Sequence, residues 1–271
     1  MSKPLIIGHR GASASAPENT LIAFELAMTE GADGIEFDVQ LASDDVPVVI
    51  HDGSLKRTGL RPELVRQLSS IELARIDVGT WFNNKFPNRA KDEFIKARVP
   101  TLEEVMECFK KRDTVLYIEM KFTVDDYTKL ARNVARLIEK HDLIDQVVVE
   151  SFALDSICEI KRLNLDIRTA ALFEPKLSRP VPSARTMIDK ALAHEADAIA
   201  LHRSLATTRA VEKATQSGLS TVVWTVDQPT WVAKAQRCGI DALITNRPEI
   251  MNRERQKVTP VEPNLSPEVS C

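Results

Sequence analysis

Short apolar runs alternate with longer amphipathic stretches along most of this chain, and no other feature constrains its fold as much. Eight of the runs have the length and composition of buried strands, and seven of the stretches between them have helical periodicity. We expect strands at 5–8, 34–39, 115–119, 146–150, 168–172, 197–201, 221–225 and 242–245. We expect helices at 20–30, 101–111, 126–140, 154–163, 183–194, 206–216 and 229–237.

This alternation predicts an α/β fold with a parallel sheet inside and helices outside, and eight strands permit closure into a (β/α)8 barrel. Residues 1–253 would form that single domain, since such barrels usually have roughly 250 residues. Residues 57–100 interrupt the alternation, and within them we expect one short helix at 63–76 and an irregular stretch at 79–100. Such a long excursion usually forms a lid or pocket wall. The polar, proline-containing residues 254–271 are typical of a loosely attached tail.

One additional apolar run, Pro47–Ile50, does not fit the alternation. Too few residues separate it from the preceding strand for a parallel crossover, so it should return antiparallel as the arm of a hairpin. If residues 44–45 form a two-residue turn, Asp38 opposes His51 in this hairpin. In that register the side chains of Glu36, Asp38 and His51 share one face of the sheet.

Composition excludes several function classes. The net charge of −3 and the pI near 6.0 argue against nucleic acid as a partner, because a broad basic surface is missing. The scattered cysteines predict neither a zinc site nor a disulfide framework. No apolar segment reaches the length of a membrane span, and no basic amphipathic helix predicts stable membrane association. The N-terminal residues leave no room for a signal peptide, so we expect a cytoplasmic protein.

Charged and imidazole side chains follow the ends of four predicted strands. The four clusters are His9-Arg10, Glu36-Phe37-Asp38, His51-Asp52 and Glu119-Met120-Lys121. If these strand ends converge, the two imidazoles can pass protons, the carboxylates can hold a hard divalent cation, and the two basic side chains can hold an anion. Together, these groups suit the cleavage of a phosphate ester.

The order and spacing of these and further motifs resemble the glycerophosphodiester phosphodiesterase family over nearly the whole chain. The motifs that carry the resemblance are His9-Arg10-Gly11, 16–20, 31–39, 46–52, 57–59, 100–105, 119–121, Ser151-Phe152, 224–226 and 245–248. The resemblance implies a distorted β/α barrel with an extra antiparallel hairpin strand and an insertion after the second strand. Two residues depart from the family's usual pattern: Asp45 stands where glycine is common, and Asp227 where asparagine often occurs.

In this reading His9 and His51 form the acid–base pair, and the sequence does not say which is which. Glu36, Asp38 and Glu119 are the expected metal ligands. Their oxygen-only chemistry favours Mg²⁺ or Ca²⁺, with Mn²⁺ as a further candidate and zinc disfavoured.

Arg10 and Lys121 are expected to hold the phosphate oxygens, with salt bridges to neighbouring carboxylates as the competing explanation. Trp224 would form an aromatic wall of the substrate pocket, although core packing explains it nearly as well. Glu18 and Asn19 would either cap the first helix or support the loop that carries His9.

The resemblance implies metal-dependent hydrolysis of a small-molecule glycerophosphodiester to sn-glycerol 3-phosphate and an alcohol. Two alternatives stay open. One is a phosphodiesterase of the lysophospholipase D type, which would need an apolar groove for an acyl chain. The other is a non-catalytic barrel that binds phosphoesters.

Overall fold

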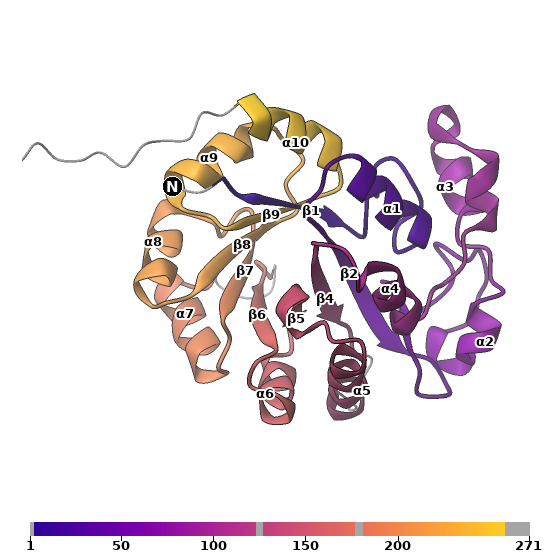
Figure 1. Cartoon of the computed structure of the whole chain (residues 1–271), viewed down its shortest axis with the longest axis horizontal. Helices are drawn as coiled ribbons and strands as arrows, with labels where there is room; N and C mark the ends of the chain where they lie inside the picture. The colour runs from indigo at the N-terminus through magenta and orange to yellow at the C-terminus, as the bar shows by residue number, and fades with distance from the viewer. Residues whose placement is uncertain (1–2, 123–126, 177–180, 258–271) are drawn as a thin grey trace, which may run out of the picture.

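The structure is a computed structural model that describes residues 3–122, 127–176 and 181–257. Within these residues, eight parallel strands close into a barrel, because β1 pairs with both β2 and β9. The barrel strands are β1 (Leu5–His9), β2 (Gly34–Leu41), β4 (Val115–Met120), β5 (Val147–Ser151), β6 (Arg168–Phe173), β7 (Ala198–His202), β8 (Ser220–Trp224) and β9 (Ala242–Thr245). Figure 1 shows the strands at the centre with helices around them, as the alternation of apolar runs predicts.

Side-chain alternation along each strand divides the core into an inner and an outer part. Inward-facing residues pack together and fill the barrel: Ile7, Tyr117, Val148, Ala170, Leu172, Ala198, Ala200, Val222, Ala242 and Ile244. The intervening residues, such as Phe37 and Ile118, face outward and pack beneath the helices. Because the inside is packed, the space for a ligand lies at the end of the barrel.

The outer helices are α1 (Leu21–Thr29), α4 (Leu102–Phe109), α5 (Tyr127–Lys140), α6 (Leu154–Leu163), α7 (Ala184–Ala193), α8 (Thr208–Gln216), α9 (Thr230–Cys238) and α10 (Pro248–Lys257). Local sequence explains several of their starts. Thr20 caps α1, and Thr101 with Glu104 forms a capping box at α4. Helix α10 was not expected from the sequence, and residues 254–257 of the predicted tail belong to it. The rest of that tail lies outside the described residues.

The predicted hairpin arm is present as β3 (Pro47–Val49), which pairs antiparallel with the end of β2. The predicted register is wrong by one residue, because Asp38 opposes Ile50 rather than His51: the Ile50 amide donates to the Asp38 carbonyl at 2.9 Å. His51 therefore lies beyond the paired strand. Gln40 holds it there by donating from its side-chain amide to the carbonyl of His51 at 2.8 Å.

The hairpin loop explains this difference. The Ala42 amide donates to the carbonyl of Val46 at 3.0 Å, so the loop contains three residues, 43–45. The last of them, Asp45, has a φ of 61° and lies in the left-handed region. The Asp45 amide donates to the carbonyl of Ala42 at 3.1 Å, which closes the turn. Aspartate tolerates this conformation better than most side chains, although glycine adopts it without strain.

The helices of the insertion differ in place and length from the one expected. The predicted helix at 63–76 is reduced to a short 3-10 turn and α2 (Ser70–Leu73), which Ser69 and Glu72 cap. The stretch predicted to be irregular contains α3 (Thr80–Lys85). Phe82 and Phe94 of the insertion pack with Ala23 of α1, so the insertion is attached to the outside of the barrel beside α1 (Figure 1). Among the described residues, no helix is long and apolar enough to cross a membrane.

Candidate active site

The carboxyl ends of the barrel strands surround a pocket of about 120 Å³. The strands are parallel, so the polar residues at their ends meet at one mouth of the barrel. The pocket is lined by His9, Arg10, Glu36, His51, Glu119, Lys121, Glu150, Phe152, Leu172, Glu174, Trp224 and Ile244. Apart from Asp38, every residue predicted to act at the site lines this pocket, and Asp38 is fully buried beside it.

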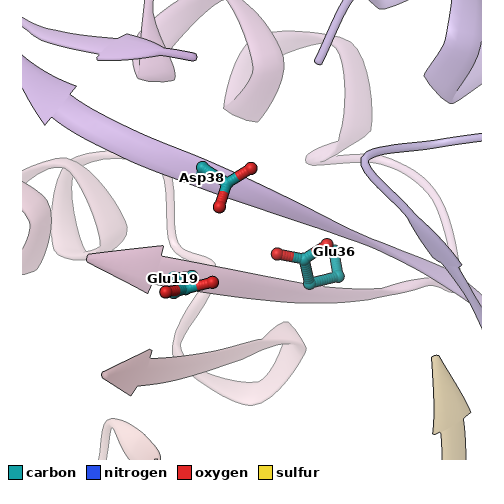
Figure 2. Close-up of side chains that lie close together, drawn as sticks. All are labelled: Glu36, Asp38 and Glu119. Carbon is teal, nitrogen blue, oxygen red and sulfur yellow. The ribbon is translucent and has the colours of Figure 1, made fainter. Parts of the chain in front are cut away.

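Glu36, Asp38 and Glu119 converge on one point. Glu36 and Asp38 are alternate residues of β2 and share a face, while Asp38 pairs in register with Glu119 on β4. Ligand atoms of the three carboxyl groups lie within 4.8 Å of one another, and all three residues are buried. Figure 2 shows the three side chains gathered from the two neighbouring strands.

Two basic side chains contact these carboxylates. Lys121 Nζ lies 2.6 Å from Glu119 Oε1 and 3.2 Å from Asp38 Oδ1, and Arg10 Nε lies 3.0 Å from Asp38 Oδ2. The salt bridges considered as the competing explanation therefore exist. Both basic side chains also line the pocket.

Burial and neighbouring charges shift the pKa values of the three carboxyl groups in different directions. Burial, followed by the Asp38 charge, raises the pKa of Glu119 to about 7 and raises the pKa of Glu36 well above its usual range. Burial alone would raise the pKa of Asp38 too, but Arg10 and Lys121 hold it well below its usual range. A hard divalent cation fits this oxygen-only set, since it would relieve the repulsion between neighbouring carboxylates.

His9 is held in a neutral form with one nitrogen directed into the site. Its Nδ1 lies 2.7 Å from Asn246 Oδ1, and its Nε2 lies 3.8 Å from Glu36 Oε2. Asn246 donates from Nδ2 to Asp227 Oδ2 at 2.8 Å, which fixes its oxygen toward His9, so His9 Nδ1 carries the proton. Burial, with Arg10 adding to it, lowers the pKa of His9 to about 4.

His51 has a different partner. Its Nδ1 lies 2.7 Å from Asp52 Oδ1, and Arg57 Nε donates to the other oxygen of Asp52 at 2.6 Å. Arg57 also donates to Glu18, which accepts a further hydrogen bond from Arg10 at 2.8 Å. The expectation that Glu18 supports the site is consistent with this network.

Asn19 supports the site rather than capping the first helix, since the cap is Thr20. Asn19 donates from Nδ2 to Asp38 Oδ2 at 2.8 Å, and its own φ is 57°. Trp224 packs edge-to-face against Phe152 and His202 at the pocket. Trp224 therefore packs against other aromatic rings and also lines the pocket.

Comparison with known proteins agrees with this geometry. The family model described as the glycerophosphoryl diester phosphodiesterase family matches residues 9–250. The chain belongs to this family. A glycerophosphodiester phosphodiesterase of Caldanaerobacter subterraneus is 32% identical, and the match covers 92% of this chain and 96% of that protein. One from Bacillus subtilis is 30% identical, with 93% of this chain and 86% of that protein covered.

Solved structures show the same fold. An Oleispira antarctica phosphodiesterase, solved in complex with the product sn-glycerol-3-phosphate, has a TM-score of 0.83 at 24% identity and covers 94% of this chain and 97% of its own. A glycerophosphoryl diester phosphodiesterase from Silicibacter pomeroyi, named as putative, has a TM-score of 0.82 at 25% identity and covers 94% of each chain. The family's distorted barrel and extra hairpin strand are thus present here.

The two departures from the family pattern have local explanations. Asp45 occupies a left-handed position, which explains why glycine is common there. Asp227 accepts hydrogen bonds from the Asn246 amide, the Asn246 side chain and the Thr245 hydroxyl. An aspartate at 227 therefore orients the asparagine that holds His9.

Sequence reasoning missed two residues of this family member's site. Asn246 lies within one of the motifs, but its contact with His9 spans 237 positions in sequence, so no local pattern indicates its role. Glu150 was read only as the end of an apolar strand, yet it is buried and lines the pocket. Its place in register with Glu119 is the signal that could have identified it.

Proposed function

We propose that this protein hydrolyses glycerophosphodiesters to sn-glycerol 3-phosphate and an alcohol, with a divalent cation, Mg²⁺, Ca²⁺ or Mn²⁺, at the site. The observation that carries the proposal is the convergence of Glu36, Asp38 and Glu119 beside a pocket that two differently held histidines line. The relatives named above as glycerophosphodiester phosphodiesterases support the choice of substrate.

Glu36, Asp38 and Glu119 would hold the cation, which would stabilise negative charge on the phosphate when bound. Lys121 and Arg10 would then have less attraction to their carboxylates and could contact the nonbridging phosphate oxygens. These contacts gain strength as charge develops in the transition state. A phosphate group would thus be held by these two basic side chains beside the carboxylate cluster.

We assign the proton acceptor to His9 and the proton donor to His51. His9 is neutral, with its proton on Nδ1 and the lone pair of Nε2 available in the pocket. His51 is the second imidazole that lines the pocket, and the Asp52 carboxylate, 2.7 Å from its Nδ1, would orient the ring toward the leaving group. The attacking oxygen would lose its proton to His9, and the leaving alkoxide would gain one from His51.

The direct test is an assay of the purified protein on glycerophosphocholine with Mg²⁺, Ca²⁺ and Mn²⁺ in turn. We expect turnover that stops on chelation and returns with at least one of these cations. Full activity after exhaustive EDTA dialysis, with no metal found by elemental analysis, would contradict a metal enzyme. Inactivity with all three cations would leave the non-catalytic barrel as the better description.

A specific observation favours a second candidate, hydrolysis of lysophospholipids. A groove of about 530 Å³ adjoins the pocket and shares Phe152, Leu172 and Glu174 with it. Leu154, Phe173 and Met187 give the groove apolar walls, so it could hold part of an acyl chain. Lys176 and Lys190 also line it, which gives it a mixed rather than purely apolar character.

We still favour small soluble diesters, because the pocket itself is small and polar. Comparing kcat/KM for glycerophosphocholine, glycerophosphoethanolamine and lysophosphatidylcholine separates the two candidates. We expect similar values for the two soluble diesters and a lower value for the lysolipid. A higher kcat/KM for lysophosphatidylcholine would reverse the assignment. If Met187→Lys then lost this activity on lysophosphatidylcholine, the acyl chain would be located in the groove.

A further inference from the structure

Arg57 connects two parts of the candidate active site from outside its pocket. Its guanidinium group donates from Nε to Asp52 Oδ2 at 2.6 Å, and from Nη1 and Nη2 to the two oxygens of Glu18 at 2.7 and 2.9 Å. All three residues lie outside the lining of the pocket. Any effect of Arg57 on catalysis would therefore act through the side chains that these two carboxylates hold.

The first of these side chains is His51. Its Nδ1 lies 2.7 Å from Asp52 Oδ1, and among the described residues Asp52 is the hydrogen-bond partner of the ring. Asp52 is partly exposed, so its carboxylate could rotate if Arg57 did not bind its second oxygen. Supporting bonds of this kind commonly contribute about tenfold to a hundredfold to activity, because they fix the orientation of the group that acts on the substrate.

The second side chain is Arg10. Its Nη1 donates to Glu18 Oε1 at 2.8 Å, and the same oxygen accepts from Nη2 of Arg57. Glu18 thus divides one negative charge between two guanidinium groups, and one of these, that of Arg10, lines the pocket. Without Arg57, the whole charge of Glu18 would attract Arg10, which would then be less available to a phosphate oxygen.

The insertion holds Arg57 in place. Its Cζ atom lies 5.5 Å from the ring centroid of Trp81, which is a typical distance for a cation–π contact. Trp81 belongs to α3, which lies outside the barrel (Figure 1), and its Nε1 donates to the carbonyl of Val78 at 2.8 Å. A planar guanidinium group that stacks on a ring and binds two carboxylates along its edge has little freedom to turn. Arg57 thus joins the insertion to both His51 and Arg10.

We propose that Arg57 is a positioning residue that orients His51 for proton transfer and keeps Arg10 available to the phosphate, with the insertion as its support. The proposal rests on the proposed function, in which His51 and Arg10 act on the bound diester. A lysine would not replace Arg57, because a single ammonium group keeps the charge but lacks the planar fork that binds both carboxylates.

The experiment compares Arg57→Ala with His51→Ala on two substrates, glycerophosphocholine and the p-nitrophenyl ester of glycerol phosphate, whose phenolate leaves without a proton. The kcat of Arg57→Ala on glycerophosphocholine should fall about tenfold to a hundredfold, and most of that loss should disappear on the nitrophenyl ester, as for His51→Ala. The KM should rise at least about threefold on both substrates, because Glu18 then attracts Arg10 more strongly.

Two further variants separate geometry, charge and folding. Arg57→Lys should restore the KM of the wild type but not its kcat on glycerophosphocholine. Arg112→Ala is the matched control, because Arg112 also forms a bidentate pair, with Glu25, stacks on Phe109 and has the same exposed side-chain fraction of 38%. Both Arg112 and Glu25 lie outside the pocket lining, so this variant should keep the kcat and KM of the wild type. Circular dichroism checks that each variant is folded.

The possible results distinguish this proposal from the proposed function. If the wild type hydrolyses neither substrate with any cation, the proposed function fails, and the role of Arg57 fails with it. If the wild type is active and Arg57→Ala matches it, only the role of Arg57 is wrong. Losses of kcat in Arg57→Ala that do not follow the substrate dependence of His51→Ala, or that Arg112→Ala shares, would make Arg57 a structural residue and overturn the proposal. Full kcat in Arg57→Lys would mean that charge alone is needed and would overturn the proposed orientation of His51.

Discussion

The division of roles between the two histidines predicts opposite responses to the leaving group. His51→Ala should lose most of its turnover on glycerophosphocholine, whose alkoxide needs a proton. It should recover much of that loss on the p-nitrophenyl ester of glycerol phosphate, whose phenolate leaves without one. His9→Ala should be impaired on both substrates, because proton removal from the attacking oxygen is needed in either case.

The structure indicates how large these losses should be. General acid–base groups contribute about 10²–10⁴ in rate, or about 2.7–5.4 kcal/mol of transition-state stabilisation. The full effect should be seen for His9 near neutral pH, because its pKa of about 4 keeps the wild-type ring neutral there. Neither substitution should unfold the protein. Asn246 Oδ1 keeps its bond from Ser13 at 2.8 Å, and Asp52 keeps its bond from Arg57.

Steady-state kinetics of both variants on both substrates, with circular dichroism as a check of folding, test this reasoning. Recovery of His9→Ala rather than His51→Ala on the p-nitrophenyl ester would reverse the two roles. Near-wild-type turnover of both variants on glycerophosphocholine would refute acid–base catalysis by this pair.

Further predictions concern the metal site, Asn246 and the hairpin loop. Glu119→Gln should raise the Mg²⁺ concentration for half-maximal rate at least about tenfold. In the wild type this concentration should fall between about pH 6 and about pH 8, because the Glu119 carboxyl, with its pKa raised to about 7, loses its competing proton over that range. A half-maximal Mg²⁺ concentration that does not change with pH would contradict this. Asn246→Ala should lower kcat about tenfold with KM little changed, since it releases His9 without touching substrate; an unchanged kcat would remove Asn246 from the site. Asp45→Val should lower the free energy of unfolding by about 1–3 kcal/mol and Asp45→Gly by less than about 1 kcal/mol; equal urea midpoints for both would mean the left-handed loop is unimportant.

Local patterns were sufficient to predict most of the fold. Each barrel strand is an apolar run with clear ends, and most helices have an apolar face that packs on the barrel. Helix α10 was missed because its buried residues, Pro248 and Met251, are too few to give a clear pattern. The hairpin register was wrong because it depends on the backbone conformation of Asp45, and nothing in the alternation of apolar residues reports a positive φ.

Site residues that belong to contiguous motifs could be predicted from the sequence. Site residues that are recognised only by their contacts with distant segments could not. Glu36 and Asp38 share a strand, so period-two geometry predicts that they converge. The contacts of Asn246 with His9 and of Arg57 with Glu18 join segments far apart in sequence, and no local pattern encodes them. Whether Oε2 of Glu150 has a hydrogen-bond partner depends on its neighbours in three dimensions, which a strand pattern does not specify.

The packed interior of the barrel has a kinetic consequence. Among the described residues, side chains such as Tyr117 and Ile7 fill the space beneath the pocket, so a substrate and both products would pass through one mouth. The fragment held at the bottom then cannot depart until the fragment nearer the opening has gone. Turnover in such a blind-ended chamber follows a fixed sequence of departures, and the last fragment to leave competes directly with the next molecule to arrive.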